Sequence, residues 1–166
     1  MEVKLLPISR EGLKDLITFS FEGDNDLLDK YHISPGDLEH CVNHTFTFIE
    51  KNKDFYKSDM HLYRVIIADL GAALTIGYTI TITNETTPHE LYSFGIRKEH
   101  RGEDVKKAWL KAIEETLGLP YYMVLWSINK RAINFFVKNG FFEEERNELS
   151  RLTNGQMEEK TLIVKT

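Results

Sequence analysis

The chain has 166 residues, of which 42% are hydrophobic and 11% aromatic, enough for one domain with a hydrophobic core over residues 1–166. The formal net charge is −5 and no window concentrates lysine and arginine, which excludes nucleic acid as an expected partner. A single cysteine excludes an internal disulfide, no apolar run approaches the roughly 18 residues of a membrane span, and the N-terminus lacks a signal-peptide profile, so a cytoplasmic protein without a membrane partner is predicted.

The first 52 residues are predicted to form one strand and two helices. Apolar residues alternate from Met1 to Ile8, as in a short strand. Ser9 is a good N-cap for the first helix, and Ser34, followed by a proline and an aspartate, begins a second helix that ends near residue 52. The inner face of the first helix is predicted to be Leu13, Leu16, Ile17 and Ser20, and that of the second Leu38, Cys41, Val42, Thr45, Phe46 and Ile49. Cys41 is therefore expected to be a buried, unreactive thiol.

Three strands are predicted next, over residues 61–69, 74–83 and 91–96. In the middle strand, apolar residues alternate with Thr79, Thr81 and Thr83, which indicates a sheet with two differently used faces. Gly71 lies in the first link, and residues 84–88 provide the second turn. Because short links join antiparallel neighbours, the three strands are predicted to form a meander.

The last part of the chain alternates helices and strands. A long helix with its inner face starting at Val105 ends at Gly118, and an apolar strand over residues 122–128 follows. This strand is predicted to run parallel to strand 91–96, because a helix connects the two. Asn129 caps a short helix, and from Phe141 onward a final pair of strands turns at Asn154-Gly155.

A short basic turn, Arg101-Gly102, lies between strand 91–96 and the long helix. A strand that passes through a tight turn into a helix presents unpaired backbone N–H groups, and the helix dipole adds positive potential, so this place suits an anion such as a phosphate. The stretch Ile96-Arg-Lys-Glu-His-Arg101-Gly102 resembles the approach to the pyrophosphate-binding turn of the GNAT superfamily of acetyl-CoA-dependent acyltransferases. In that family the turn reads Arg/Gln-x-x-Gly-x-Gly/Ala and cradles the pyrophosphate of the coenzyme.

A second stretch, Asn129-Lys-Arg-Ala132-Ile-Asn-Phe135-Phe136-Val-Lys-Asn-Gly140-Phe141, resembles the other GNAT signature, Asn-x-x-Ala-x-x-Leu/Phe-Tyr-x-x-x-Gly-Phe. It follows the first signature by one strand, and the resemblance covers residues 62–142, about half of the chain. It implies an α+β protein of the GNAT fold, with a mixed, mostly antiparallel twisted sheet of about seven strands flanked by about four helices.

The resemblance also implies an activity: an N-acetyltransferase that moves an acetyl group from acetyl-CoA to a primary amine by direct attack in a ternary complex. Acetyl-CoA is then the co-substrate, and the acceptor is a small-molecule or peptide amine. The backbone of residues 94–96 would bind the pantetheine arm like an added strand, and one of its N–H groups would hold the oxyanion. The residues implied near the coenzyme are Phe94, Gly95, Ile96, Arg101, Gly102, Asp104, Val105, Lys106, Lys107, Asn129 and Phe136.

Transfer to an amine requires that the amine lose a proton, and the candidate bases lie on the strand that would line the cleft. Glu90 and Tyr92 alternate onto one face of that strand; the alternative for each is an ordinary surface or packing residue. His40 and His44 lie four residues apart on one helix, but no local third ligand completes a set, so no metal site is expected.

Three residues depart from the family pattern and support a second hypothesis. Asp104 and Lys106 occupy positions where the family has small residues, and Phe136 replaces the tyrosine that many members use as a general acid. The alternative is therefore a non-catalytic GNAT-fold binding or regulatory module with weak or no coenzyme binding. A homodimer formed through sheet edges or the terminal hairpin is compatible with both hypotheses.

Overall fold

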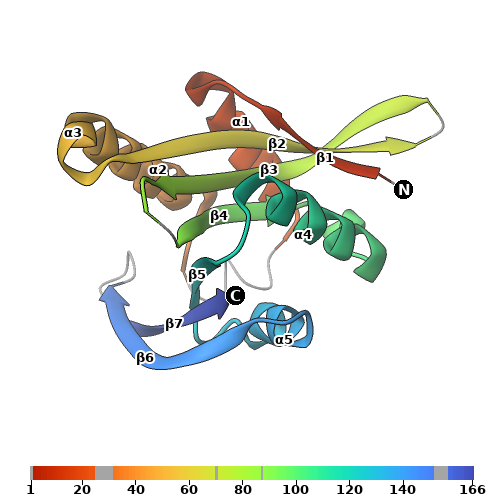
Figure 1. Ribbon diagram of the computed structural model, residues 1–166. Coiled ribbons are helices and arrows are strands. Elements are labelled where there is room, and N and C mark those ends of the chain that lie inside the picture. Colours follow the sequence, from red (N-terminus) through yellow and green to blue (C-terminus); the bar gives the residue numbers. More distant parts are fainter. Residues whose placement is uncertain (1, 25–31, 70, 87, 152–156) are drawn as a thin grey trace.

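The computed structural model describes residues 2–24, 32–69, 71–86, 88–151 and 157–166. Within these residues the chain forms one seven-stranded sheet with α-helices on both faces (Figure 1). The strands are β1 (Glu2–Pro7), β2 (Ser58–Asp69), β3 (Ala72–Asn84), β4 (His89–Ile96), β5 (Tyr121–Trp126), β6 (Phe142–Arg151) and β7 (Met157–Lys165). The helices are α1 (Arg10–Phe21), α2 (Pro35–Lys51), α3 (Lys53–Tyr56), α4 (Glu103–Leu117) and α5 (Lys130–Lys138), with a 3-10 turn at Lys98–His100. The predicted α+β class is confirmed, and the short α3 is a helix that the sequence did not predict.

The strand order is β1-β2-β3-β4-β5-β7-β6. The predicted meander is confirmed, because β2, β3 and β4 pair as consecutive antiparallel neighbours. The predicted parallel pair is confirmed as well, since β4 and β5 run parallel on the two sides of the α4 connection. β6 and β7 pair antiparallel as expected, while the predicted turn at Asn154-Gly155 lies outside the described residues.

Buried side chains of the described residues form two clusters, one on each face of the sheet. The larger cluster joins α4 and α5 to the sheet and includes Trp109 and Phe136. The smaller cluster joins α1 and α2 to the opposite face and includes Ile17 and Tyr78. The predicted inner face of α1 is fully confirmed. The prediction for Cys41 is wrong: its side chain is exposed, because Val42 is the residue of α2 that is fully buried and Cys41 lies at the margin of the apolar stripe.

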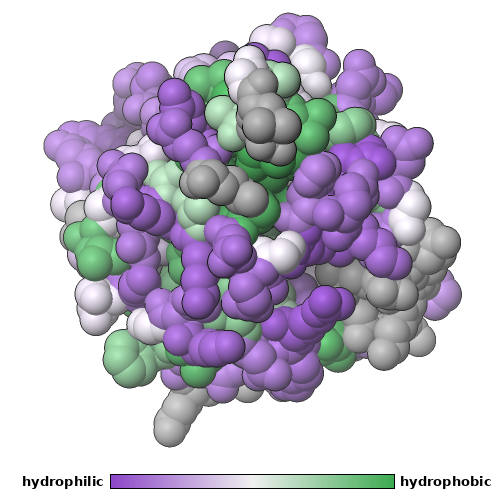
Figure 2. All heavy atoms as spheres, turned by 90° about the vertical axis from the view of Figure 1, so that its right-hand side faces the viewer, coloured by the Kyte–Doolittle hydropathy of each residue, from purple (hydrophilic) through white to green (hydrophobic). Residues whose placement is uncertain are grey.

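The helix starts follow the predicted caps. Ser9 Oγ accepts a hydrogen bond from Gly12 N at 3.2 Å, and Ser34 forms a reciprocal capping box with Asp37. On the side of the molecule shown in Figure 2, hydrophilic side chains cover most of the surface and a narrow apolar band runs between them. No helix of the described part of the chain is long and apolar enough to cross a membrane.

Replacing either of two threonines on the same face of β3 with valine should change the free energy of unfolding in opposite directions. Thr79 Oγ1 accepts a buried hydrogen bond from Trp109 Nε1 at 2.9 Å, whereas Thr81 Oγ1 is buried and has no hydrogen-bond partner among the described residues. Thr79→Val leaves the indole N–H unpaired and should lower the free energy of unfolding by about 1–3 kcal/mol. Thr81→Val removes an unsatisfied hydroxyl and should raise it by about 1 kcal/mol. Urea denaturation of both variants tests the two predictions. Changes of the same sign in the free energy of unfolding would contradict the different hydrogen bonding of the two hydroxyls.

Candidate functional site

The site is defined by the place where β4 and β5 separate. Among the described residues the two strands pair at His89 with Tyr121 and at Glu90 with Tyr122. Beyond these positions β4 continues along β3 and β5 continues along β7, so the edge of β4 that faces β5 is left without a neighbouring strand. The separation begins at a β-bulge centred on Tyr92, which has no partner in β3. A bulge bends a strand and increases its twist, which directs the rest of β4 away from β5.

β4 then leads through the 3-10 turn to the N-terminus of α4. Gly102 is the N-cap residue, in an extended conformation, and no side chain of the described residues caps the helix. The first bond within the helix runs from Lys106 N to Gly102 O at 3.0 Å, so the N–H groups of residues 103–105 lack partners within the helix. A Cβ built on Gly102 would meet no heavy atom within 4 Å, so an anion has room to approach the backbone.

The Arg101 side chain links this turn to β4 and to the end of α1. Its Nε donates to Ile96 O at 2.6 Å, and its Nη2 lies 2.5 Å from a carboxylate oxygen of Asp24, which follows α1. The Asp24 side chain is only 4% exposed, whereas Arg101 is partly exposed. The guanidinium therefore holds the end of β4 and the end of α1 together, and its exposed part faces solvent beside the helix N-terminus.

The charges in the first turn of α4 partly cancel one another. Glu103 forms an ion pair with Lys106 at 3.3 Å, and this partner holds the pKa of the Glu103 carboxyl below its usual range. Asp104 and Lys107 are exposed, while Val105 is buried in the core below them. The first five residues of α4 therefore carry two acidic and two basic side chains, so the local charge is close to balanced.

Aromatic rings pack between β4 and the helices α4 and α5, on the sheet face that these helices cover. The Phe94 ring centroid lies 4.9 Å from that of Trp109 and 5.7 Å from that of Phe136. Phe136 is 1% exposed, so it is a packing residue that joins α5 to β4. Asn129 caps α5 by accepting a hydrogen bond from Ala132 N at 3.4 Å. The structure thus brings Phe94 and Phe136 together. Asn129 lies at the start of α5, the helix that carries Phe136.

The two predicted catalytic candidates have different surroundings. Glu90 accepts a hydrogen bond from the Tyr122 hydroxyl at 3.4 Å, and burial raises its pKa although this bond and Lys160 act in the opposite direction. Burial also raises the pKa of Tyr92, whose hydroxyl lies 2.7 Å from Thr45 Oγ1 on α2. The Tyr92 hydroxyl is therefore hydrogen-bonded to α2, whereas Glu90 is hydrogen-bonded to the titratable side chain of Tyr122. A carboxyl with a raised pKa is better matched to taking a proton near neutral pH.

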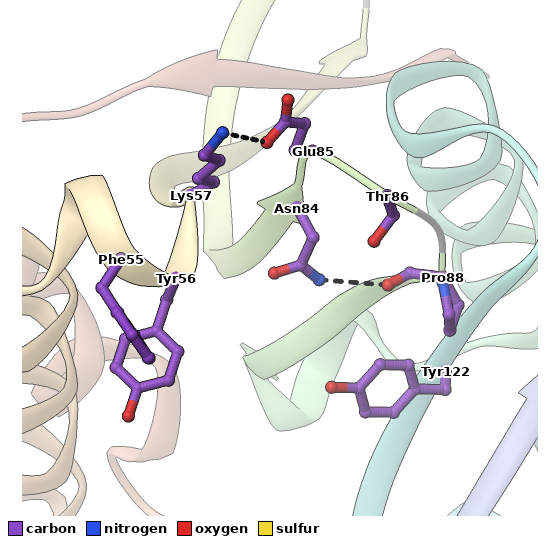
Figure 3. Close-up of a pocket in the computed structure, with 8 residues that line it drawn as sticks. All are labelled: Phe55, Tyr56, Lys57, Asn84, Glu85, Thr86, Pro88 and Tyr122. Carbon is purple, nitrogen blue, oxygen red and sulfur yellow. Dashed lines mark hydrogen bonds and ion pairs between the residues drawn. The ribbon is translucent and has the colours of Figure 1, made fainter.

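Sequence reasoning missed a hollow beside Tyr122, whose hydroxyl donates to Glu90. It has a volume of about 380 Å³ and lies between α3, the β3–β4 turn and β5 (Figure 3). Its lining residues are Phe55, Tyr56, Lys57, Asn84, Glu85, Thr86, Pro88 and Tyr122. The available signal was the adjacent pair Phe55-Tyr56 directly after a helix, but these residues show no apolar periodicity that would mark them.

No protein-family model and no curated protein matches the sequence. Solved structures do match over nearly the whole chain. An acetyltransferase from Thermus thermophilus superposes with a TM-score of 0.64 at 16% identity, covering 99% of this chain and 97% of that one. A chimeric spermidine N-acetyltransferase from Vibrio cholerae and hSSAT gives 0.61 at 16% identity, with coverages of 99% and 95%. The NatC complex, solved with a Gag peptide and CoA, gives 0.56 at 16% identity, with coverages of 99% and 98%.

The protein therefore has the fold of the GNAT acetyltransferases, which are its structural neighbours along the full chain. At this level of identity the likeness establishes the architecture. The activity, coenzyme and acceptor are a separate question, which depends on the residues of this chain.

Proposed function

We propose that the protein is an N-acetyltransferase that moves an acetyl group from acetyl-CoA to a primary amine. The observation that carries the proposal is the continuous path from the separation of β4 and β5 to the uncapped N-terminus of α4 at Gly102. An extended chain of amides suits an unpaired strand edge, and a diphosphate suits a helix N-terminus with room for a close approach. The shared fold of acetyltransferases supports the same assignment.

In this proposal each part of the chain has a defined task. Acetyl-CoA supplies an activated acyl group with a thiolate leaving group. The free edge of β4 over residues 94–96 donates N–H groups to the pantetheine arm and to the developing oxyanion. Gly102, Arg101, Lys106 and Lys107 hold the diphosphate, with Asp104 and Val105 in the same turn, and Asn129 lies beside the arm. Glu90 takes the proton of the attacking ammonium group, with Tyr122 holding its carboxyl.

A second candidate function is a coenzyme-independent binding module, and two observations favour it. Phe136 is a buried ring without a hydroxyl, so it supplies no acid for the leaving thiolate. Arg101 is already paired with the buried Asp24, which competes for its charge. Under this alternative the fold persists without coenzyme affinity.

Titration with acetyl-CoA in a thermal unfolding experiment separates the two functions. At a concentration a hundred times the dissociation constant, binding adds about 2.7 kcal/mol and should raise the melting temperature by roughly 5–10 °C. Lys107→Glu, in the first turn of α4, should reduce the shift because it adds negative charge beside the diphosphate. Lys111→Glu, one turn further along the same helix and also exposed, is the matched control and should leave the shift unchanged. No shift at millimolar acetyl-CoA would reject the transferase and leave the binding module.

A further inference from the structure

The hollow beside Tyr122 has aromatic walls on opposite sides. Phe55 and Tyr56 come from α3 and Tyr122 from β5, and Figure 3 shows the Tyr122 hydroxyl directed into the space between them. Phe55 and Tyr56 are 81% and 52% exposed, and their ring centroids lie 4.9 Å apart in an edge-to-face arrangement. Large aromatic side chains that remain this exposed around a hollow offer stacking surface to a ligand.

The hollow lies at the opposite end of β4 from the turn into α4. Pro88, just before β4, lines it, whereas Ile96 ends the strand next to Arg101. Eight residues of strand span roughly 25 Å, so a coenzyme that extends from the turn along β4 would approach the hollow from the side of the bulge. The Tyr122 hydroxyl connects the hollow to the Glu90 carboxyl at 3.4 Å. A ligand in the hollow is therefore linked to the Glu90 carboxyl through the Tyr122 hydroxyl.

The charges around the hollow restrict the kind of ligand. Glu85 forms an ion pair with Lys57 at 3.2 Å, so the two charges that line the hollow balance each other. The balanced pair offers no net negative charge to the several ammonium groups of a polyamine. What remains is three aromatic rings and the Tyr122 hydroxyl, which bonds the Glu90 carboxyl, and these suit one ammonium group joined to an aromatic or apolar group.

We propose that this hollow is the acceptor subsite and that the acceptor is a small monocationic amine with an aromatic group close to the nitrogen, rather than a polyamine. The inference rests on the proposed acetyl transfer for its role in the reaction. The binding of the amine itself does not require the coenzyme. The ammonium group lies towards Glu90, and the aromatic group stacks between Tyr122 and the α3 pair Phe55-Tyr56.

Binding of phenethylamine, spermidine and ethylamine to the protein without coenzyme, measured by calorimetry, tests the subsite directly. Phenethylamine should bind at least tenfold more tightly than either of the other two, because only it combines one charge with a stacking ring. Tyr56→Ala and Phe55→Ala should each weaken phenethylamine roughly three- to tenfold. Phe142→Ala removes an exposed ring on β6, outside the hollow, and should change nothing. Lys57→Gln should reduce the ratio of phenethylamine affinity to spermidine affinity, because it leaves the negative charge of Glu85 unbalanced.

Steady-state acetyl transfer distinguishes failure of this inference from failure of the proposed function. The α3 variants should raise KM for phenethylamine by the same factors, with kcat and the acetyl-CoA thermal shift unchanged. If acetyl-CoA binds but the α3 variants leave phenethylamine affinity and KM at the wild-type values, the subsite is refuted and the transferase stands. If spermidine binds more tightly than phenethylamine, the proposed acceptor class is wrong. If phenethylamine binds as expected but acetyl-CoA does not, the hollow is a binding site and the acetyl transfer is refuted.

Discussion

Replacing Gly77 with alanine should lower the free energy of unfolding by about 3 kcal/mol. Gly77 lies in β3 opposite Ile96, and a Cβ at this position would be 2.0 Å from the Gly95 carbonyl oxygen and 2.9 Å from Ile96 Cα. Both atoms belong to the backbone of β4, so no side chain can rotate away to relieve the contact. Either the hydrogen bonds between β3 and β4 break or the end of β4 moves. Urea denaturation measures the loss.

Gly36 provides the matched control for this change. It lies in the first turn of α2, and a Cβ there would meet only Ser34 Oγ at 3.6 Å. Gly36→Ala should therefore leave stability unchanged or raise it by about 0.5 kcal/mol, because alanine restricts the unfolded chain. A Gly77→Ala protein as stable as the Gly36→Ala protein would show that the two strands are further apart than the structure has them. Because Gly95 and Ile96 belong to the proposed pantetheine-binding edge, Gly77→Ala should also weaken acetyl-CoA binding.

Replacing Arg101 with alanine should cost about 2–3 kcal/mol of folding free energy. The change leaves the buried Asp24 carboxylate without its cation and removes the bond to Ile96 O. Removal of one partner of a buried ion pair costs roughly 3–5 kcal/mol because the other charge stays desolvated, and the partial exposure of Arg101 makes the expected loss smaller. The same variant should weaken acetyl-CoA binding, since the cation beside the helix N-terminus is lost.

A double-mutant cycle separates the ion pair from other effects of the Arg101 substitution. Asp24→Asn removes the charge of the partner and keeps its size. The protein with both substitutions should be more stable than the sum of the two single losses predicts, by about 1 kcal/mol or more, because the uncompensated charge is gone. Strictly additive losses in urea denaturation would show that Asp24 and Arg101 are not coupled.

The elements of the fold could be predicted from local signals. Alternation marked the strands of the meander, and the serines at positions 9 and 34 marked helix starts that the structure confirms by their side-chain bonds. Periodicity gave a wrong result for Cys41, because a stripe of apolar residues does not show how wide the contact with the sheet is. The bulge at Tyr92 was not predicted, since one unpaired residue leaves the apolar pattern of β4 almost unchanged.

The candidate site could be predicted less completely, because its contacts join distant parts of the chain. Arg101 and Gly102 were found from their place between a strand and a helix. The partner of Arg101 was not, since Asp24 follows α1 within a polar stretch that predicts only a loop. The hollow was also missed, because it forms only when α3 and β5 are brought to opposite sides of the β3–β4 turn. Coenzyme binding by the predicted residues stays a prediction.

The separation of β4 from β5 also has a mechanical consequence. The sheet has two parts, one formed by β1 to β4 and the other by β5, β7 and β6. Among the described residues, backbone pairing joins the two parts at His89 and Glu90 of β4. Beyond the paired positions, the edge-to-face contact between Phe94 and Phe136 takes the place of backbone hydrogen bonds. Ring contacts tolerate small tilts better than hydrogen bonds do, so we expect any change in the angle between the two parts to occur about the paired end. The bulk of these two rings then sets how narrow the gap can become.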